Sequence, residues 1–268
     1  MSQLLPTSNP AFVDPRSRPV AIALHHVAFS YTDTPDILQD VTLTIREGER
    51  VGLIGHNGCG KTTLFMLICG LLQPSAGTVT LFDQPVRLNQ FYPEVGLLFQ
   101  DPEDQLFSPS VEDDVAFGPQ NLGLSEAEIT ARVEAALELT GMTALAKRPP
   151  HHLSGGEKQM VAIAGLLAMC PRVLLYDEPT ASLDLRTRRR LIGFLQRSDE
   201  TLVIASHDLE FLLEVCDRVV LIDDGQIIAD GNARDIMGNQ TLMEKHGLEK
   251  PHSLIPHSDP HHTRSDRP

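Results

Sequence analysis

The chain has 268 residues, and 41% of them are hydrophobic, which is enough for one or two globular domains with a sizeable buried core. It carries 22 Lys and Arg against 36 Asp and Glu, so its formal charge at pH 7 is −14. Binding a phosphate backbone needs surplus positive charge, and we therefore expect no nucleic-acid partner. The one basic cluster, at 186–190, is interpreted as a solvated helix face.

Cysteine usage and apolar patterning indicate a cytoplasmic protein. The four cysteines are isolated, with no CxxC pair, which is typical of a reducing compartment. The longest apolar run, 161–170, is about half as long as the ~20 residues that a membrane-spanning helix needs. No basic-then-apolar signal pattern is evident near the N-terminus. A membrane role would therefore depend on a partner.

The predicted elements alternate between strands and helices. Residues 1–19 are rich in Pro, Ser and Asn and are predicted to be a flexible leader. Alternating or continuous apolar patterns predict strands at 20–31, 40–46, 50–54, 78–82, 94–99, 172–176, 201–205 and 218–222. Helices are predicted at 61–72, 125–139, 155–169 and 184–197, the second of them beginning with a capping box of Ser125 and Glu128.

This order predicts an α/β fold with a mostly parallel core sheet, an added antiparallel β layer and an inserted helical subdomain. The domain is expected to cover 20–240, with the helical subdomain at about 101–170. Residues 241–268 are rich in Pro and His and are predicted to be a flexible tail. Five histidines lie in that tail, and whether they bind a metal is left open.

Residues 55–62 read GHNGCGKT, which matches the phosphate-loop pattern G-x-x-x-x-G-K-[ST] without a mismatch. The loop follows an apolar strand and precedes a helix, so backbone N–H groups and the helix N-terminus should surround phosphate oxygens. Lys61 is predicted to contact the β- and γ-phosphates, and Thr62 to bind Mg²⁺. The expected nucleotide contacts in the loop are Gly55, His56, Asn57, Gly58, Cys59, Gly60, Lys61, Thr62 and Thr63.

An apolar run at 173–176 ends in Asp177 and Glu178, at the strand edge where open α/β sheets bind ligands. Asp177 is predicted to hold Mg²⁺, and Glu178 to orient or deprotonate the attacking water. His207 and Gln100 follow two other strands and should reach the same edge, where His207 would donate to the γ-phosphate and Gln100 would touch Mg²⁺ or water. The predicted catalytic residues are Glu178, His207 and Lys61. The predicted metal ligands are Thr62, Gln100 and Asp177, and the predicted cofactors are ATP and Mg²⁺.

The sequence LSGGE at 153–157, followed by DEPTASLD at 177–184 and ASHD at 205–208, resembles the signature of ATP-binding cassette (ABC) ATPases. The similarity covers about 20–240 and implies a P-loop NTPase fold that hydrolyses ATP. It also implies that Ser154, Gly155 and Gly156 begin a helix that reaches the ATP of a second cassette, in a homodimer or a heterodimer. Tyr31 matches the aromatic residue that stacks on adenine, although a plain strand-end tyrosine is an alternative.

The segment 99–118, FQDPEDQLFSPSVEDDVAFG, is similar to the ATPases of energy-coupling-factor importers. The resemblance implies a transmembrane coupling subunit, a substrate-binding membrane subunit and a place on the cytoplasmic face of the cell membrane. The implied cargo is cobalt or nickel; biotin or another vitamin, or a soluble ABC ATPase without transport, are alternatives. Six acids and no Lys or Arg lie at 101–114, and we expect them to receive a cationic partner element rather than form a plain solvated loop: Asp101, Glu103, Asp104, Glu112, Asp113 and Asp114.

Overall fold

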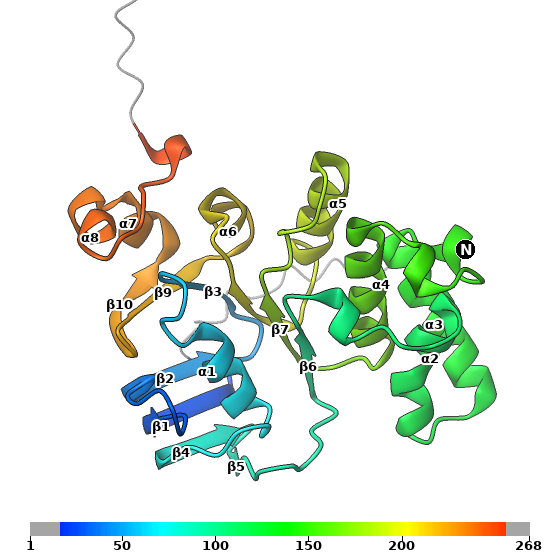
Figure 1. Ribbon diagram of the computed structural model, residues 1–268, viewed down its shortest axis with the longest axis horizontal. Helices are drawn as coiled ribbons and strands as arrows, with labels where there is room; N and C mark the ends of the chain where they lie inside the picture. The colour runs from blue at the N-terminus through cyan, green and yellow to red at the C-terminus, as the bar shows by residue number, and fades with distance from the viewer. Residues whose placement is uncertain (1–16, 256–268) are drawn as a thin grey trace, which may run out of the picture.

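The computed structural model describes residues 17–255, which form two β-sheets and a separate group of helices (Figure 1). The larger sheet has six strands in the order β10-β9-β3-β8-β7-β6. Their bounds are β3 Arg50–Ile54, β6 Val95–Leu98, β7 Val173–Asp177, β8 Thr201–Ala205, β9 Arg218–Asp223 and β10 Gln226–Asn232. All neighbours pair in parallel except β10, which pairs antiparallel with β9. The strands β7 and β8 are buried at every residue, as expected for parallel strands covered on both faces.

The smaller sheet is antiparallel, in the order β2-β1-β4-β5, and matches the predicted antiparallel layer. Its strands are β1 Val20–Phe29, β2 Leu38–Arg46, β4 Ala76–Leu81 and β5 Gln84–Pro85. The helix α1, Lys61–Ile68, contributes Leu64 and Phe65 to a core shared with both sheets. The phosphate loop is therefore anchored at one end in the large sheet and at the other in a helix packed between the two layers.

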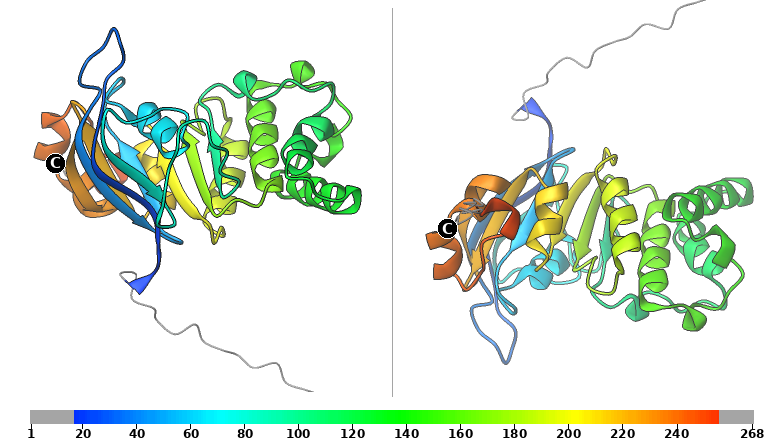
Figure 2. Two further views of the ribbon diagram at one scale, coloured as in Figure 1. Left: turned by 90° about the horizontal axis from the view of Figure 1, so that it is seen from below. Right: turned by 90° about the horizontal axis from the view of Figure 1, so that it is seen from above.

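Three helices form the helical subdomain at one end of the molecule, beyond β6 and β7 (Figure 2). They are α2 Val111–Asn121, α3 Glu126–Thr140 and α4 Gly155–Ala168, and their buried faces join a second core. The predicted capping box of Ser125 and Glu128 is present at α3. Short 3-10 turns lie at Pro102–Asp104 (η2), Thr143–Leu145 (η3) and Pro150–His152 (η4). The sequence did not predict α2, so the subdomain contains one helix more than expected.

The arginine-rich helix α5, Leu185–Leu195, is not a plain solvated face as predicted. Arg188 has only 16% of its side chain exposed and donates to both carboxylate oxygens of Asp208, at 2.8 and 3.2 Å. Asp208 in turn caps α6, Leu209–Val215, by accepting from the N–H of Phe211. The side chain of Arg188 therefore holds α5 against the start of α6.

The chain stays folded beyond the predicted end of the domain. Residues after β10 form α7 Ala233–Gly238, α8 Gln240–Lys245 and a 3-10 turn (η5) at His252–Leu254. Met243 is fully buried, and Ser253 donates to Glu210 of α6 at 2.6 Å. The predicted start of a flexible tail at 241 is therefore wrong, because apolar and polar contacts fix this segment to the domain. The rest of the predicted tail, from 256 and including His257, His261 and His262, and leader residues 1–16 lie outside the described residues.

Among residues 17–255, no helix combines the length and the apolar character needed to cross a membrane.

Candidate active site

An open pocket of about 860 Å³ lies at the carboxyl ends of the parallel strands. It brings together side chains that are far apart in the sequence, as predicted for this edge of the sheet. The pocket is lined by Tyr31, Thr34, Ile37, Asn57, Gly58, Gly60, Lys61, Thr62, Thr63, Gln100, Asp177, Glu178, Thr180, Ala181, His207 and Asp208.

Two glycines of the phosphate loop cannot be replaced without moving the backbone. Gly55 has φ +153°, and a Cβ there would lie 2.1 Å from the carbonyl oxygen of Ile222. Gly60 has φ +104°, and a Cβ there would lie 2.7 Å from Cδ2 of Leu38. Gly60 is also the N-cap of α1 and makes no side-chain cap hydrogen bond. The N-terminal N–H groups of α1 thus face the pocket without a capping side chain, which suits an anion such as phosphate.

Lys61 and Thr62 lie at the start of α1 with their polar atoms turned to the loop and to β7. The Lys61 ammonium is 7% exposed and donates to the carbonyl oxygens of Gly55 and His56, at 2.8 and 3.1 Å. The Thr62 hydroxyl donates to Oδ2 of Asp177 at 2.5 Å. Burial raises the pKa of Asp177, and the hydrogen bond from Thr62 and the charge of Lys61 partly oppose this rise. These oxygens, with the amide of Gln100 on the same pocket wall, fit the hard oxygen ligands that Mg²⁺ prefers.

Glu178 is oriented so that only one of its carboxylate oxygens is bound by the protein. Its Oε2 accepts from the Ser206 hydroxyl and from the His207 backbone N–H, both at 3.2 Å. Its Oε1 is buried, accepts no hydrogen bond from residues 17–255, and lies 3.5 Å from Nε2 of His207. Glu178 also has φ +48°, a conformation uncommon for a side chain of this kind. Oε1 thus has unused acceptor capacity, and it can act on a water only after the side chain turns toward the pocket.

The sequence did not predict a role for Ser206 or Asp208. Ser206 is 1% exposed, and besides donating to Glu178 it accepts from the N–H of Asp208 at 3.1 Å. Asp208 lines the pocket and is held by Arg188. Their sequence signal is the ASHD stretch at 205–208, directly after a buried strand.

Tyr31 lies on the pocket wall, as expected for a residue that contacts the base. Its side chain is 41% exposed, its hydroxyl lies 3.3 Å from that of Thr63, and its ring packs edge-on against Phe29 at 4.9 Å. The contact with Phe29 also fits the alternative of a plain strand-end tyrosine.

The side chains of His56 and Cys59 do not line the pocket, although both residues belong to the predicted nucleotide-binding loop. Nε2 of His56 lies 2.9 Å from Oδ1 of Asp223, at the end of β9. The Cys59 thiol is 2% exposed, and burial raises its pKa. We therefore expect these two positions to contact a nucleotide through their backbone atoms.

The signature residues Ser154, Gly155 and Gly156 begin α4 as predicted, but they are not part of the pocket. Ser154 and Glu157 form a capping box, in which the Ser154 hydroxyl accepts from the N–H of Glu157 at 3.3 Å. Glu157 returns the contact by accepting from the N–H of Ser154 at 2.8 Å. The three residues thus remain on the helical subdomain, outside their own chain's nucleotide pocket.

The acidic segment 101–114 is not the unpaired strip that the sequence suggested. Five of its six acids already have partners: Asp101 accepts from the N–H of Glu103, Glu103 pairs with Lys158, Glu112 pairs with Lys147, Asp113 bonds to Ser110, and Asp114 accepts from the N–H groups of Phe107 and Ser108. Asp114 is also 9% exposed. Only Glu103 and Glu112 have cationic partners, and Asp101, Asp104 and Asp113 are exposed, so the segment keeps a net negative charge and the attraction of a cationic partner element stays a prediction.

A phosphate loop after β3, an Asp–Glu pair at the end of β7 and a helical subdomain with an LSGGE helix define an ATP-binding cassette of the P-loop NTPase fold. Comparison with known proteins agrees: the ABC transporter family matches residues 38–181, and the chain belongs to that family. It is therefore an ATPase subunit of the ABC transporter class.

Similar proteins cover most of the chain. An ABC transporter ATP-binding protein from Synechocystis sp. is 62% identical over 236 residues, which span 88% of this chain and 83% of that protein. The energy-coupling factor transporter ATP-binding protein EcfA from Methanothermobacter thermautotrophicus is 43% identical over 86% of this chain and 76% of its own. The solved structure of cbiO1 from Clostridium perfringens, part of the ABC transporter complex cbiONQ, has a TM-score of 0.75 and 35% identity, covering 85% of this chain and 94% of that one.

Proposed function

We propose that two cassettes close around MgATP, each burying the nucleotide between the pocket of one chain and Ser154–Gly156 of the other. The observation that carries this proposal is the separation of the two parts within one chain: the pocket holds Lys61, Asp177 and Glu178, while the signature helix begins outside it. A second copy arranged head to tail supplies what each pocket lacks. The complete set of motifs makes a homodimer workable, with a heterodimer as the alternative.

In this dimer Tyr31 stacks on adenine, and residues 55–63 surround the phosphates. Thr62, Asp177 and Gln100 hold Mg²⁺, which neutralises the phosphate charge. Glu178 takes the proton of the attacking water through Oε1 once its side chain turns this buried atom toward the pocket, and His207, which also lines the pocket, contacts the γ-phosphate. Nucleotide-driven closure then moves the helical subdomain of each chain relative to the pocket of the other.

The chain energises an importer of the energy-coupling-factor type, at the cytoplasmic face of the cell membrane, together with a transmembrane coupling subunit and a substrate-binding membrane subunit. The likeness to EcfA and to cbiO1 supports this assignment, as does the segment 99–118. The proposed cargo is cobalt or nickel ions, on the resemblance of that segment; biotin or another vitamin is the alternative.

The coupling contact is an apolar groove in the helical subdomain, and Asp104 and Asp114 of the acidic segment also line it. Phe107 and Phe117 are 67% and 47% exposed, pack edge-to-face at 4.9 Å, and line a groove of about 270 Å³ with Leu166 and Met169. Exposed aromatic pairs beside a groove are typical of protein interfaces. A transmembrane subunit therefore docks here through a mainly apolar element. Substituting both phenylalanines by Ser should leave MgATP binding intact and remove co-purifying membrane proteins; retained co-purification would place the contact elsewhere.

Mixing two inactive variants tests the composite site. Lys61→Ala destroys the pocket but keeps the signature, whereas Gly156→Asp keeps the pocket but places a negative charge at the signature. Each variant alone should lack ATPase activity. Mixed dimers regain one intact site, so an equimolar mixture should recover up to about a quarter of the wild-type sites.

The control is a mixture of Lys61→Ala with Glu178→Gln, whose lesions lie in the same pocket. In that mixed dimer both sites remain defective, so no activity should return. Equal recovery in the two mixtures, or activity in Gly156→Asp alone, would contradict the composite site.

A further inference from the structure

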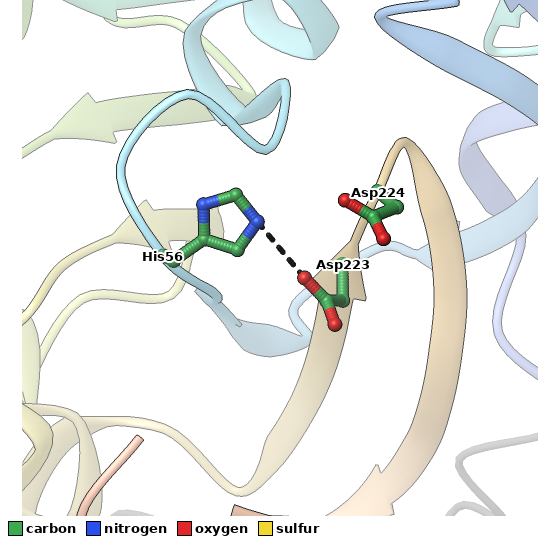
Figure 3. A group of neighbouring side chains, drawn as sticks. All are labelled: His56, Asp223 and Asp224. Carbon is green, nitrogen blue, oxygen red and sulfur yellow. Dashed lines mark ion pairs between the residues drawn. The ribbon is translucent and has the colours of Figure 1, made fainter. Parts of the chain in front are cut away.

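Three metal-ligating side chains meet where the phosphate loop faces the turn between β9 and β10. His56 projects from the loop, while Asp223 and Asp224 lie at the turn between β9 and β10 (Figure 3). One ligand atom of each, an imidazole nitrogen and two carboxylate oxygens, lies within 4.8 Å of the other two, and within residues 17–255 no other such group of three is found. None of the three lines the nucleotide pocket.

The hydrogen bonding of His56 fixes which of its nitrogens is free to bind a cation. Nδ1 lies 2.7 Å from the backbone carbonyl oxygen of Asn57, and a carbonyl can only accept, so Nδ1 must carry a proton. In the neutral ring Nε2 then holds a lone pair, and this atom faces Oδ1 of Asp223 at 2.9 Å. A lone pair and a carboxylate oxygen repel each other unless a proton or a metal ion lies between them.

His246, which is not one of the three residues, orients the Asp223 carboxylate through a hydrogen bond. Oδ2 of Asp223 accepts from Nδ1 of His246 at 2.5 Å, and the His246 side chain is only 10% exposed. The remaining oxygen, Oδ1, is the one that faces His56. Metal-binding histidines and carboxylates in proteins are oriented by such outer partners, here the Asn57 carbonyl for His56 and the His246 imidazole for Asp223.

The distances fit a single ion. Two ligands that each lie about 2.1 Å from an ion are about 3.0 Å apart in octahedral coordination and about 3.4 Å apart in the tetrahedral coordination usual for Zn²⁺. Nε2 of His56 and Oδ1 of Asp223 are separated by 2.9 Å. A carboxylate oxygen of Asp224 lies within 4.8 Å of both atoms, and Asp224 is exposed, so the core does not restrict its side chain.

We propose that His56, Asp223 and Asp224 bind a divalent first-row transition-metal ion of the Zn²⁺ type, distinct from the Mg²⁺ of MgATP. One imidazole and two carboxylates, completed by water, suit Zn²⁺, Co²⁺ or Ni²⁺ better than Mg²⁺ or Ca²⁺, which prefer oxygen ligands alone. Because the carbonyl oxygen of His56 accepts from Lys61, a bound ion ties the phosphate loop to the β9–β10 turn. Binding of the ion is therefore expected to restrict the backbone of the phosphate loop, which forms part of the nucleotide site.

Calorimetric titration of the full-length protein with Zn²⁺, without nucleotide because triphosphates chelate metals, tests the proposal. Co²⁺ serves as a second probe, since its visible absorption reports nitrogen and oxygen ligation. His56→Ala and Asp224→Asn should each weaken the site at least about 10-fold, and His246→Gln by about 10- to 100-fold. Asp224 has φ +44°, which Asn tolerates, so Asp224→Asn should fold normally even if His56→Ala disturbs the loop.

His26→Ala is the matched control. His26 also lies beside a carboxylate, with its Nδ1 2.7 Å from Oδ1 of Asp40, but it does not belong to a group with a second carboxylate. The proposal is supported if one equivalent of metal is weakened by the His56 and Asp224 substitutions and not by His26→Ala. It is overturned if affinity and stoichiometry are unchanged in both His56→Ala and Asp224→Asn, which would assign any bound metal to other histidines, such as those after residue 256.

Discussion

Two helices of this chain begin with glycine-rich sequences, and they differ in what completes their first turn. The helix α1 starts at Gly60 without a side-chain cap, under the buried ammonium of Lys61. The helix α4 starts at Ser154 and is closed by a capping box with Glu157. An uncapped helix terminus in a polar pocket is completed by an anionic ligand, whereas a capped one is stable by itself. The chain thus holds one terminus that requires a ligand and another that can be presented to a partner.

The residues that surround the two helix starts also differ. The start of α1 lies beside Asp177 and Glu178, whose carboxylates are proposed to bind Mg²⁺ and activate water. The start of α4 instead packs close to Ser182, in the loop after β7. Chemistry and phosphate binding are concentrated at α1, and α4 offers recognition only. The following predictions separate these roles, beginning with the largest effect.

Replacing Glu178 by Gln should stop turnover without preventing nucleotide binding. The amide keeps the size and the hydrogen bonds from Ser206 and His207 but cannot take a proton, so kcat should fall by about 10²- to 10⁴-fold. Steady-state ATPase assays measure the loss. Light scattering should show a dimer that persists with MgATP, because the trapped nucleotide is not hydrolysed. Full ATPase activity in this variant would remove Glu178 from the mechanism.

Features formed by a few consecutive residues were predictable from the sequence. The phosphate loop, the pair Asp177–Glu178 and the capping box at Ser125 each occupy a few consecutive residues whose local geometry sets their role. The parallel sheet then follows from apolar strands alternating with helices. Sheet topology alone brings Gln100 and His207 to the same edge.

Features formed by pairing across long sequence distances were not predictable. The helix α2 escaped prediction because it contains Pro119 and begins within an acidic segment. The acids there looked unpaired because partners such as Lys147 and Lys158 lie on other elements. The contact of His56 with Asp223 joins residues 167 positions apart (223 − 56), and no local period encodes it. Long-range polar pairs, unlike apolar periodicity, leave no trace in a single sequence.

Removing the cap of α4 should impair both stability and activity, whereas removing the same cap from α3 should impair stability alone. Ser154→Ala and Ser125→Ala each remove the acceptor for an N3 backbone N–H and should each cost about 1 kcal/mol of the free energy of unfolding. Only Ser154 is proposed to contact the partner's nucleotide, and its loss should lower kcat on the order of 10²-fold. Urea denaturation and ATPase assays on the two variants give the comparison.

Equal ATPase losses in Ser154→Ala and Ser125→Ala would mean that the cap of α4 acts only by stabilising the helical subdomain. That result would break the distinction between the two helix starts. A loss confined to Ser154→Ala would sharpen it, because the two capping boxes are chemically identical and only their positions differ.

Asp177→Asn, in the pocket at the start of α1, should abolish ATPase activity without lowering the free energy of unfolding. Burial raises the pKa of Asp177 above its usual value, which means that the folded state disfavours the charged carboxylate. The protonated group is accommodated at low pH, and the ionised group costs stability once pH rises above the raised pKa. Asn is neutral at every pH and still accepts from Thr62, so at pH 7 it should stabilise the nucleotide-free protein by on the order of 1 kcal/mol.

The sign of this effect can be checked against pH. The gain from Asp177→Asn should shrink as pH falls and vanish below about 3.9, the ordinary pKa of an Asp side chain, because the wild-type residue is then neutral as well. Thermal melts of both proteins from pH 7 downward measure it, with MgATP left out since bound Mg²⁺ would stabilise the charged form. A variant that is less stable than wild type at pH 7 would show that Thr62 and Lys61 outweigh burial. The start of α1 would then be stabilised by its own side chains, as the start of α4 is by its capping box. The two helix starts would no longer differ in whether they require a ligand.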